Sequence, residues 1–203
     1  DQKLDSLLRT QLQANGFHEH YSNSLQKEKN TRHFVGGDAI EVKNPLSKDM
    51  AFIRNSIIPG LLMAASYNEK RQEKGFKLFE IGAIHNQSKK SATGTNEKFH
   101  LGLLWYGEAQ SHWRSYEDRD LFRCKGEISQ MLQSVGIANV SFKIGNEYGF
   151  QNLLKIYSGK TQIGKVGIPD SKILQQYNLK VNPTVCDLSL HNLRELWQNQ
   201  KLV

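Results

Sequence analysis

Residues 43–82, KNPLSKDMAFIRNSIIPGLLMAASYNEKRQEKGFKLFEIG, constrain the fold of this chain more than any other stretch. The proline of Asn44-Pro45 fixes its own backbone and disfavours a helical conformation at Asn44, so a preceding strand must end in a turn. Ser56 can cap a helix whose early proline, Pro59, sits where a missing amide donor costs little. The stretch therefore predicts a strand end, a loop, a second strand over residues 76–85 and, between them, a helix that buries Ile58, Leu61, Leu62 and Ala65.

The rest of the chain alternates between helical and strand patterns. Leu4, Leu7, Leu8 and Leu12 recur at helical spacing before Gly16, which predicts an amphipathic helix over residues 3–15. A second long helix is expected over residues 120–135. The remaining predictions are strands at 17–21, 39–43, 99–106, 140–144, 153–157, 161–168 and 185–190, loops at 26–38 and 86–98, and short helices after Pro169 and over 191–197. Strands joined mostly by hairpin-like loops and interrupted by long helices indicate an α+β fold, an antiparallel sheet flanked by helices, in a single domain over residues 1–203.

Composition and charge bound the class of protein. With 203 residues, 38% hydrophobic and 23% charged, the chain is typical of globular proteins, and none of its apolar runs approaches the roughly 18 to 20 residues of a membrane span. The net charge of +7 is spread among acids, which we interpret first as a solvated surface and second as a nucleic-acid patch. Cys124 and Cys186 lack metal-type spacing and predict free thiols in a reducing, cytoplasmic compartment. Because the chain starts at Asp1 and continues at once into a helical pattern, we expect a fragment of a longer protein.

Candidate chemical motifs give little support to catalysis. Gly159–Val166, GKTQIGKV, matches a phosphate-binding loop except that Val166 replaces the required hydroxyl, and its alternation predicts a strand rather than the helix that such a loop opens. His18 and His20 share one face of a predicted strand, but two ligands without a third make a weak metal site, so we prefer solvent-facing histidines. We predict no catalytic residue and no metal ligand.

Two further features have both a structural and a functional interpretation. Glu80 lies within an apolar strand and is the best candidate for an unusual environment; we prefer a carboxylate satisfied by a neighbouring side chain. Trp105, Trp113 and Tyr116 offer rings that can stack on a nucleic-acid base or pack in a core or interface, and we prefer packing.

Several motifs together resemble the beta subunit of bacterial phenylalanyl-tRNA synthetase, in its catalytic-like core module. They are, in order, Asn44-Pro45-Leu46, Arg54-Asn55-Ser56, Pro59-Gly60-Leu61-Leu62 and Leu78-Phe79-Glu80-Ile81-Gly82. LRTQLQANGFHE at residues 8–19 and DLFRCKGEISQMLQSVGI at residues 120–137 are similar to the elements that precede and follow this unit. The resemblance therefore covers nearly all of the chain.

The resemblance implies a class II aminoacyl-tRNA synthetase fold, in agreement with the α+β prediction. It also implies an alpha subunit that activates phenylalanine with ATP and magnesium and charges tRNA(Phe), in a heterotetramer of two alpha and two beta subunits. A working class II site carries Arg-x-Glu on a strand and a later glycine-rich segment ending in arginine. Lys77-Leu78-Phe79-Glu80 lacks that arginine and residues 187–194 lack glycine, so the resemblance implies a catalytically degenerate module that binds no cofactor and supports the alpha subunit.

Two sets of residues follow as candidate sites. The first helix and the strand after it occupy the place of the class II dimerisation motif, so contact with the alpha subunit is predicted for Leu4, Leu8, Leu12, Phe17 and Tyr21. An alternative function, direct tRNA binding, is predicted for Lys70, Arg71, Lys74 and Lys77. A further alternative is a module that retains residual adenylation activity.

Overall fold

The computed structural model describes residues 2–35, 39–107 and 121–200. Its helices are α1 (Gln2–Ala14), α2 (Glu28–Thr31), α3 (Ile58–Glu69), α4 (Leu121–Ser134), α5 (Ser171–Gln176) and α6 (Leu190–Gln200), with one 3-10 turn, η1 (Lys48–Met50). Its strands are β1 (His18–Glu19), β2 (Leu25–Gln26), β3 (Ile40–Glu41), β4 (Phe52–Ile53), β5 (Gly75–Gln87), β6 (Thr95–Gly107), β7 (Val140–Gly145), β8 (Phe150–Ser158), β9 (Thr161–Pro169) and β10 (Thr184–Ser189). No helix in these ranges is long and apolar enough to cross a membrane.

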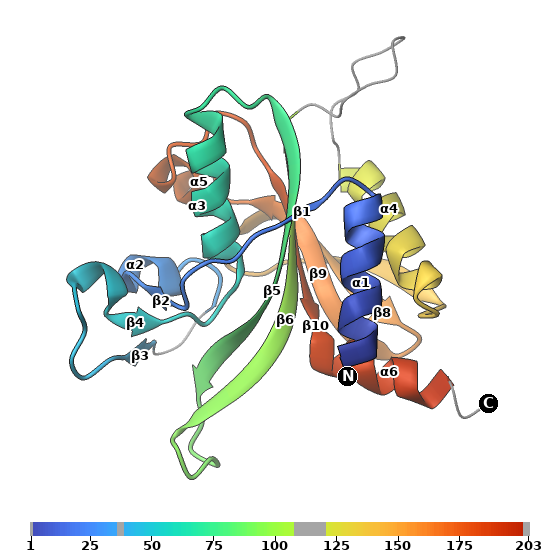
Figure 1. The fold of residues 1–203 in the computed structure, drawn as a ribbon, viewed down its shortest axis with the longest axis horizontal. Helices are drawn as coiled ribbons and strands as arrows, with labels where there is room; N and C mark the ends of the chain where they lie inside the picture. The colour runs from blue at the N-terminus through green and yellow to red at the C-terminus, as the bar shows by residue number, and fades with distance from the viewer. Residues whose placement is uncertain (1, 36–38, 108–120, 201–203) are drawn as a thin grey trace.

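A seven-stranded sheet forms the centre of the molecule, in the order β1-β5-β6-β10-β9-β8-β7. Every pairing in it is antiparallel except that of β1 with β5, which is parallel. A second sheet of three short strands, β2-β4-β3, lies to one side of it (Figure 1). The α+β architecture predicted from the sequence, an antiparallel sheet flanked by helices, is confirmed.

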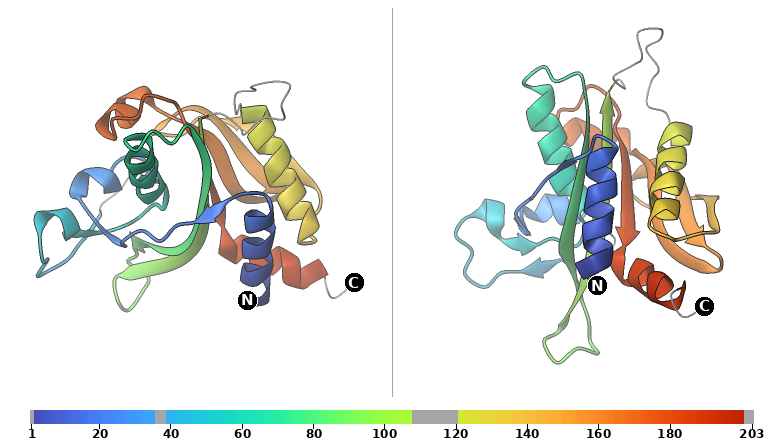
Figure 2. Two further views of the ribbon diagram at one scale, coloured as in Figure 1. Left: turned by 45° about the horizontal axis from the view of Figure 1, so that its top comes forward. Right: turned by 45° about the vertical axis from the view of Figure 1, so that its right-hand side comes forward.

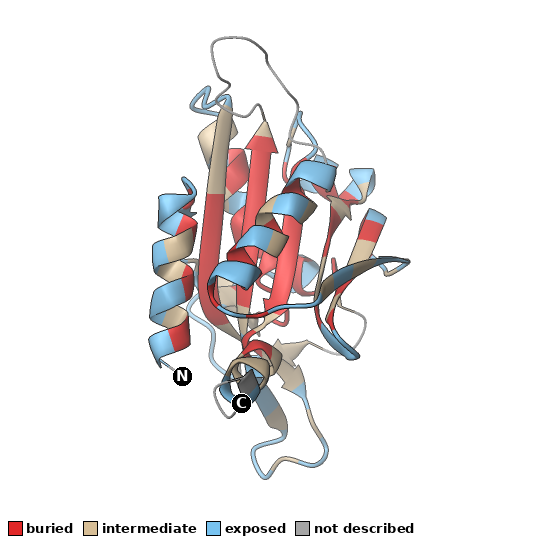
Figure 3. Cartoon of the chain, turned by 90° about the vertical axis from the view of Figure 1, so that its right-hand side faces the viewer, coloured by how far each residue is buried: buried red, intermediate tan, exposed pale blue. Residues whose placement is uncertain are grey.

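The two faces of the large sheet carry different helices (Figures 1 and 2). Helices α1, α4 and α6 cover one face, where their apolar side chains form a single cluster with residues of β5, β6 and β10. Helices α3 and α5 cover the other face, with α2 and the small sheet beside them, around a second cluster. Seen from the α1, α4 and α6 side, the outward surfaces of the helices are exposed and the central strands behind them are buried (Figure 3). We call the second face, which carries α3, the α3 face.

Helix α1 follows its predicted pattern closely. Leu4 and Leu8 are 0% exposed and Leu12 is 1% exposed, all in the cluster of the α1, α4 and α6 face. Gly16 takes a φ of +79°, a backbone conformation that glycine adopts without strain, directly after the helix. The amide of Phe17 then donates to the carbonyl of Leu12 at 3.0 Å, which closes the last turn. The predicted helix with its glycine stop is confirmed.

Helix α3 lies directly on the middle of the large sheet. Pro59 occupies its first turn, and Ser56 Oγ accepts a hydrogen bond from the Ile58 amide at 3.3 Å. The buried residues predicted for this helix are all buried. Gly102 of β6 makes the approach possible, because a Cβ at that position would lie 2.6 Å from Cγ2 of Ile57. The β6 backbone at Gly102 is therefore in close contact with the side chains of Ile57 and Leu61.

The predicted loop over residues 86–98 is wrong. Strands β5 and β6 continue as a long hairpin in which Asn86 pairs with Asn96 and Gln87 pairs with Thr95, so only residues 88–94 connect them. The outer half of the hairpin extends beyond the body of the sheet (Figure 1). Because its side chains are largely exposed on both faces, this part has no hydrophobic alternation from which a strand could be predicted.

The predicted loop over residues 26–38 is also incomplete. It contains Gln26 at the end of β2 and the short helix α2, in which Asn30 and Thr31 are buried although both are polar. The predicted strand over residues 17–21 shortens to β1, and the one over residues 39–43 shortens to β3. Strand β4 has no counterpart among the predicted elements. These elements are short and polar, so the sequence carries little periodicity to indicate them.

The second half of the chain follows the prediction. Helix α4 and strands β7, β8, β9 and β10 lie where the pattern predicts them, as do α5 after Pro169 and α6 at the end. Asp120, predicted as the first residue of the α4 helix, lies outside the described residues. Residues 159–166 form the β8–β9 turn and most of β9, and no helix begins within them. The phosphate-loop interpretation of GKTQIGKV therefore lacks the helix N-terminus on which it depends.

Candidate functional site

A row of charged residues crosses the α3 face of the large sheet. The register of five consecutive strand pairings places in one line Glu80, Gly102, Asp187, Lys165, Lys155 and Lys143. The strand neighbours two positions away, among them Leu78, Leu104 and Val185, belong to the apolar cluster around α3. Because side chains alternate along a strand, the row lies on this same face. The row also joins the two segments, on β5 and on β10, that the class II resemblance associates with ATP.

The β5 end of the row is a buried ion pair. Arg54 Nη1 donates to Glu80 Oε1 at 2.5 Å, and the two side chains are only 5% and 2% exposed. Ser22 completes the carboxylate's partners, since its hydroxyl donates to Glu80 Oε2 at 2.7 Å and its amide to Glu80 Oε1 at 3.3 Å. The predicted satisfaction of Glu80 by a neighbouring side chain is confirmed, and the neighbour is Arg54.

The middle of the row forms a second, less deeply buried set of pairs. His100 Nδ1 lies 2.5 Å from Asp187 Oδ1, and Lys165 Nζ lies 2.9 Å from Glu147 Oε2. Lys155 Nζ contacts the same Glu147 carboxylate at 3.4 Å. Most of these side chains line a cavity of about 350 Å³ between the ends of β6, β9 and β10.

The charges of these carboxylates are stabilised from within the chain. Burial alone would raise the pKa of Asp187, but the neighbouring His100, with a contribution from Lys165, outweighs it and the pKa is lowered. The pKa of Glu147 is lowered in the same way, since burial is outweighed by Lys165 and Lys155. Both acids are therefore ionised at neutral pH and already have bonding partners within the chain.

This arrangement supports little chemistry. A metal needs at least three suitable ligands, and in residues 2–35, 39–107 and 121–200 no three or more His, Cys, Asp or Glu side chains gather closely enough. Leu78, at the place of the arginine in the class II Arg-x-Glu pattern, is buried in the apolar cluster with α3. Glu80, Asp187, Lys165 and Lys155 of the row each have a partner of potentially opposite charge within the chain.

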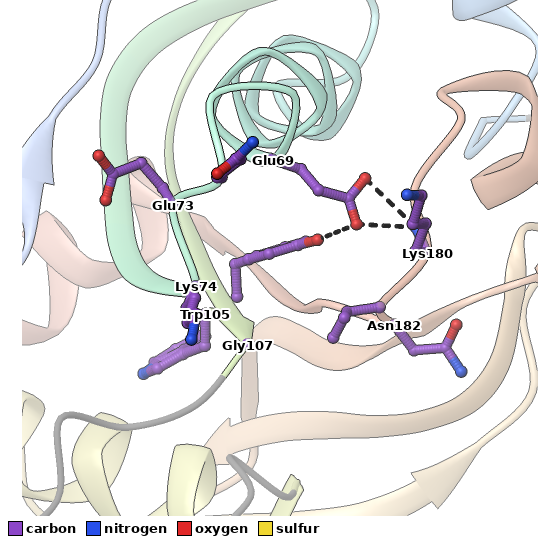
Figure 4. A pocket seen from close by; sticks show the side chains of 10 residues that line it. Glu69, Glu73, Lys74, Trp105, Gly107, Lys180 and Asn182 are labelled. Carbon is purple, nitrogen blue, oxygen red and sulfur yellow. Dashed lines mark hydrogen bonds between the residues drawn. The ribbon is translucent and has the colours of Figure 1, made fainter.

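Another cavity, of about 650 Å³, lies at the opposite end of β5 and β6 (Figure 4). In it the Glu69 carboxylate accepts from the Tyr106 hydroxyl and, at 3.0 and 3.3 Å, from the amide of Lys180. Burial and the adjacent Glu69 raise the pKa of Tyr106 well above its ordinary value, so its hydroxyl keeps its proton. Of the two acids in the described lining of this cavity, Glu69 and Glu73, the first is thus already bonded.

The residues predicted to contact an alpha subunit lie in two different settings. Leu4, Leu8 and Leu12 are in the core, and Phe17 is 4% exposed and packs edge-on against Trp105 at a centroid distance of 5.3 Å. Among the predicted residues, only Tyr21, at 72%, is open to a partner. A partner that left this fold intact would therefore touch the outer surface of α1 and Tyr21, and not the leucines themselves.

The four residues predicted to contact tRNA are not brought together. Lys70, Arg71 and Lys74 are exposed around the turn that follows α3. Lys77 is half-buried on the opposite face of the sheet, which carries α1 and α4. Its Nζ lies 2.7 Å from Glu127 Oε2 of α4 and 3.2 Å from the carbonyl oxygen of Asn15. Lys77 therefore has a structural partner, whereas the other three are exposed.

The remaining predictions concern aromatic residues and histidines, some of which lie outside the described residues. Trp105 is 2% exposed in the core, in agreement with the packing interpretation, while Trp113 and Tyr116 lie outside the described residues. His18 is exposed, and the ring of His20 is partly exposed. The sequence did not predict the His100–Asp187 pair or the burial of His33. The His100–Asp187 pair could have been found only from the register between β6 and β10.

Two solved structures share this fold, both pyrrolysyl-tRNA synthetases from Desulfitobacterium hafniense. One has a TM-score of 0.74 at 15% identity over 97% of this chain and 68% of that chain. The other has a TM-score of 0.76 at 13% identity over 97% of this chain and 69% of that chain. The chain therefore has the fold of the class II aminoacyl-tRNA synthetases.

The sequence identifies the family within that class. The pattern of the phenylalanyl-tRNA synthetase beta chain CLM domain matches residues 1–190, so the chain belongs to this family. The beta subunit of phenylalanine–tRNA ligase from Francisella tularensis is 26% identical over 93% of this chain and 24% of the relative. The beta subunit of Buchnera aphidicola from Acyrthosiphon pisum is 27% identical over 80% of this chain and 21% of the relative. That of Zymomonas mobilis is 35% identical over 61% of this chain and 15% of the relative. The chain thus spans at most about a quarter of these relatives.

Proposed function

We propose that this chain is a non-catalytic core module of a phenylalanyl-tRNA synthetase beta subunit, which supports an alpha subunit in charging tRNA(Phe). The observation that carries the proposal is the state of Leu78 and Glu80 on β5. By the resemblance, Leu78 stands where a working class II enzyme has a phosphate-binding arginine, and it is buried under α3. Glu80 is neutralised by Arg54. A buried leucine cannot stabilise the negative charge that develops on the α-phosphate during adenylate formation, and the Arg54 cation is already engaged by Glu80.

ATP and magnesium accordingly belong to the alpha subunit in this proposal. Pyrophosphate exchange with ATP and phenylalanine tests it directly, with the isolated alpha–beta enzyme as the positive control. The chain by itself is expected to give no exchange above background. Exchange that depends on phenylalanine would support residual adenylation activity, the alternative function, and overturn the non-catalytic role.

The partner surface we propose is the outside of α1 together with Tyr21. Glu19 of β1 joins them, because its Oε1 accepts from Arg9 Nε of α1 at 2.8 Å and from the Tyr21 hydroxyl at 3.1 Å. Tyrosine is enriched at protein interfaces, where its ring is buried and its hydroxyl keeps a polar partner. This surface lies at the β1 edge of the large sheet.

A matched pair of tyrosines tests the surface. Tyr21 is 72% exposed and Tyr148, in the turn between β7 and β8 at the opposite edge of the sheet, is 71% exposed. In the beta subunit that carries these residues, Tyr21→Ser is expected to weaken co-purification with the alpha subunit, and Tyr148→Ser is not. Equal retention by both variants would exclude Tyr21 from the interface. Light scattering of the complex checks the two-alpha, two-beta stoichiometry.

A second candidate function, RNA binding, is favoured by the exposure of Lys70, Arg71 and Lys74 around one turn. Contacts of lysine and arginine with phosphates release counterions, so such binding weakens steeply with salt. Titration of the chain with tRNA at several salt concentrations tests this function. Salt-insensitive binding, or none at low salt, would exclude it.

A further inference from the structure

A cleft of about 350 Å³ lies between three helical segments on the α3 face. One side comes from Lys27, Lys29, Asn30 and His33 in and around α2, a second from Met63, Ser66, Tyr67 and Lys70 of α3 and the residue after it, and the third from Gln176, Tyr177 and Asn178 around the end of α5. We call it the three-helix cleft. Its volume falls at the small end of the range usual for ligand sites.

The floor of the three-helix cleft is polar but uncharged. His33, which is 5% exposed, places Nδ1 2.9 Å from the Tyr177 hydroxyl and Nε2 3.0 Å from Gln176 Oε1. Burial lowers the pKa of His33, and nearby Lys29 lowers it further, so the ring is neutral at physiological pH. These contacts satisfy both ring nitrogens of His33 and leave the floor without a fixed charge.

The rim combines aromatic surface with cations. Met63, Tyr67 and Lys70 line the cleft from α3 and the residue after it, and Tyr67 and Met63 are 56% and 40% exposed. Arg71 is not part of the described lining but follows directly after Lys70. The guanidinium carbon of Arg71 lies 3.4 Å from the centroid of the Tyr67 ring, so the two groups already form a cation–π pair. A further planar group can stack on this pair.

The charge of the three-helix cleft has one sign. Its described lining contains Lys27, Lys29 and Lys70 and no carboxylate, whereas the cavities beside Glu69 and beside Asp187 each contain acids. Lys27 is paired with Asp49 at 3.0 Å, while within the described ranges no ion pair engages Lys29, Lys70 or Arg71. The cleft therefore favours a ligand that is planar and anionic.

We propose that the three-helix cleft binds an unpaired nucleotide of RNA. The base stacks on Tyr67 and Arg71 over the neutral floor, and the flanking phosphates contact Lys29 and Lys70. This inference deepens the RNA-binding candidate described above and rests on it. It is independent of the proposed alpha-subunit contact, which involves α1 on the other face of the sheet.

Fluorescence anisotropy with labelled single-stranded polyuridine and polyadenine oligonucleotides tests the site, in the beta subunit that carries these residues. Tyr67→Ala is expected to lower the affinity about tenfold or more, because one stacking platform is removed, and Tyr67→Phe to preserve it. Lys29→Gln with Lys70→Gln is expected to reduce the slope of log affinity against log salt by about 0.7 for each phosphate that is no longer neutralised. Tyr67 is mostly exposed, so these variants are expected to fold, which circular dichroism checks.

Tyr157 provides the matched control. Its ring lies 4.8 Å from Lys143 Nζ, a similar tyrosine–cation pair, but on β8 and β7 at the edge of the sheet. Tyr157→Ala is expected to leave RNA affinity unchanged. Equal decreases in affinity for Tyr67→Ala and Tyr157→Ala, or equal binding of a duplex RNA, would overturn the proposal.

Two further outcomes distinguish RNA binding in the cleft from binding of free nucleotides and from the alpha-subunit contact. Displacement by uridine or adenosine monophosphate at the concentration of the oligonucleotide would assign the cleft to free nucleotides and overturn the RNA assignment. Weakened RNA binding by Tyr67→Ala with normal alpha-subunit co-purification would support the cleft and leave the subunit role intact.

Discussion

Arg54 and Glu80 form a buried ion pair in which Nη1 of the arginine lies 2.5 Å from Oε1 of the carboxylate. The same guanidinium donates from Nε to the carbonyl of Ala83 at 2.7 Å and from Nη1 to the hydroxyl of Ser22 at 2.9 Å. A Cβ at Gly82 would overlap Nη2 of Arg54, so that glycine leaves room for the guanidinium. One arginine thereby ties β5 to the segment that precedes the small sheet.

Removal of one partner from this pair is expected to destabilise the fold strongly. Arg54→Met leaves the Glu80 carboxylate buried without its counter-charge, which costs about 3 to 5 kcal/mol of unfolding free energy. The double variant Arg54→Met with Glu80→Leu is expected to recover much of that stability, because both charges are gone. Urea unfolding measures both. The exposed Arg32–Glu28 pair is the control, since Glu28→Gln is expected to change stability by no more than about 1 kcal/mol. A decrease of similar size in Glu28→Gln would contradict the role of burial.

Two glycines are expected to respond oppositely to alanine. Gly149 has a φ of +90°, and a Cβ there would overlap the carbonyl oxygen of His33, so Gly149→Ala is expected to cost more than about 2 kcal/mol. Gly126 lies inside α4, and a Cβ added to it would meet nothing within 4 Å, so Gly126→Ala is expected to gain about 0.5 to 1 kcal/mol. Thermal unfolding of both variants measures the contrast. If Gly149→Ala were as stable as wild type, the backbone at Gly149 and the carbonyl of His33 would not approach each other closely.

Neighbouring leucines of α1 separate core from surface. Leu8 is 0% exposed and Leu7 is 37% exposed. Leu8→Ala is expected to cost about 2 to 5 kcal/mol, as for other fully buried leucines, and Leu7→Ala less than about 1 kcal/mol. Urea midpoints at equal slope measure the difference, and equal midpoints for the two variants would contradict it. A charged substitution at Leu8 would therefore report on folding before it reported on subunit contact, which makes Tyr21 the better probe of the interface.

The parts of the fold that are predictable from the sequence are those with apolar periodicity. The leucines of α1, the stripe of α3 and the inner face of α4 repeat at helical spacing, and the central strands are strongly apolar. The outer half of the β5–β6 hairpin and helix α2 escape prediction because their stability comes from backbone pairing and from packing by polar residues. Periodicity of hydrophobic residues indicates burial, and these segments bury little apolar surface.

The candidate sites depend on contacts between residues far apart in the chain. An unusual environment for Glu80 is predictable from its apolar strand, but Arg54, its partner, is 26 positions away. The charged row requires the register of five strand pairings, and a shift of one residue in any of them would move side chains to the other face. His33, Tyr67 and Gln176 meet only because α2, α3 and α5 lie on the same face of the sheet.

Acid is expected to destabilise the fold through His33. Burial is the largest cause that lowers the pKa of His33 from its ordinary 6.5, with Lys29 adding to it and the hydrogen bond to Gln176 opposing it. Since the unfolded chain binds the proton more readily, His33 stabilises the fold above pH 6.5 and this contribution is lost as the pH falls through the lower pKa of the folded state. His33→Gln removes the titration and is expected to flatten the fall in unfolding free energy between about pH 7.5 and 5. Parallel pH profiles for wild type and His33→Gln would show that the His33 ring is not held neutral by burial.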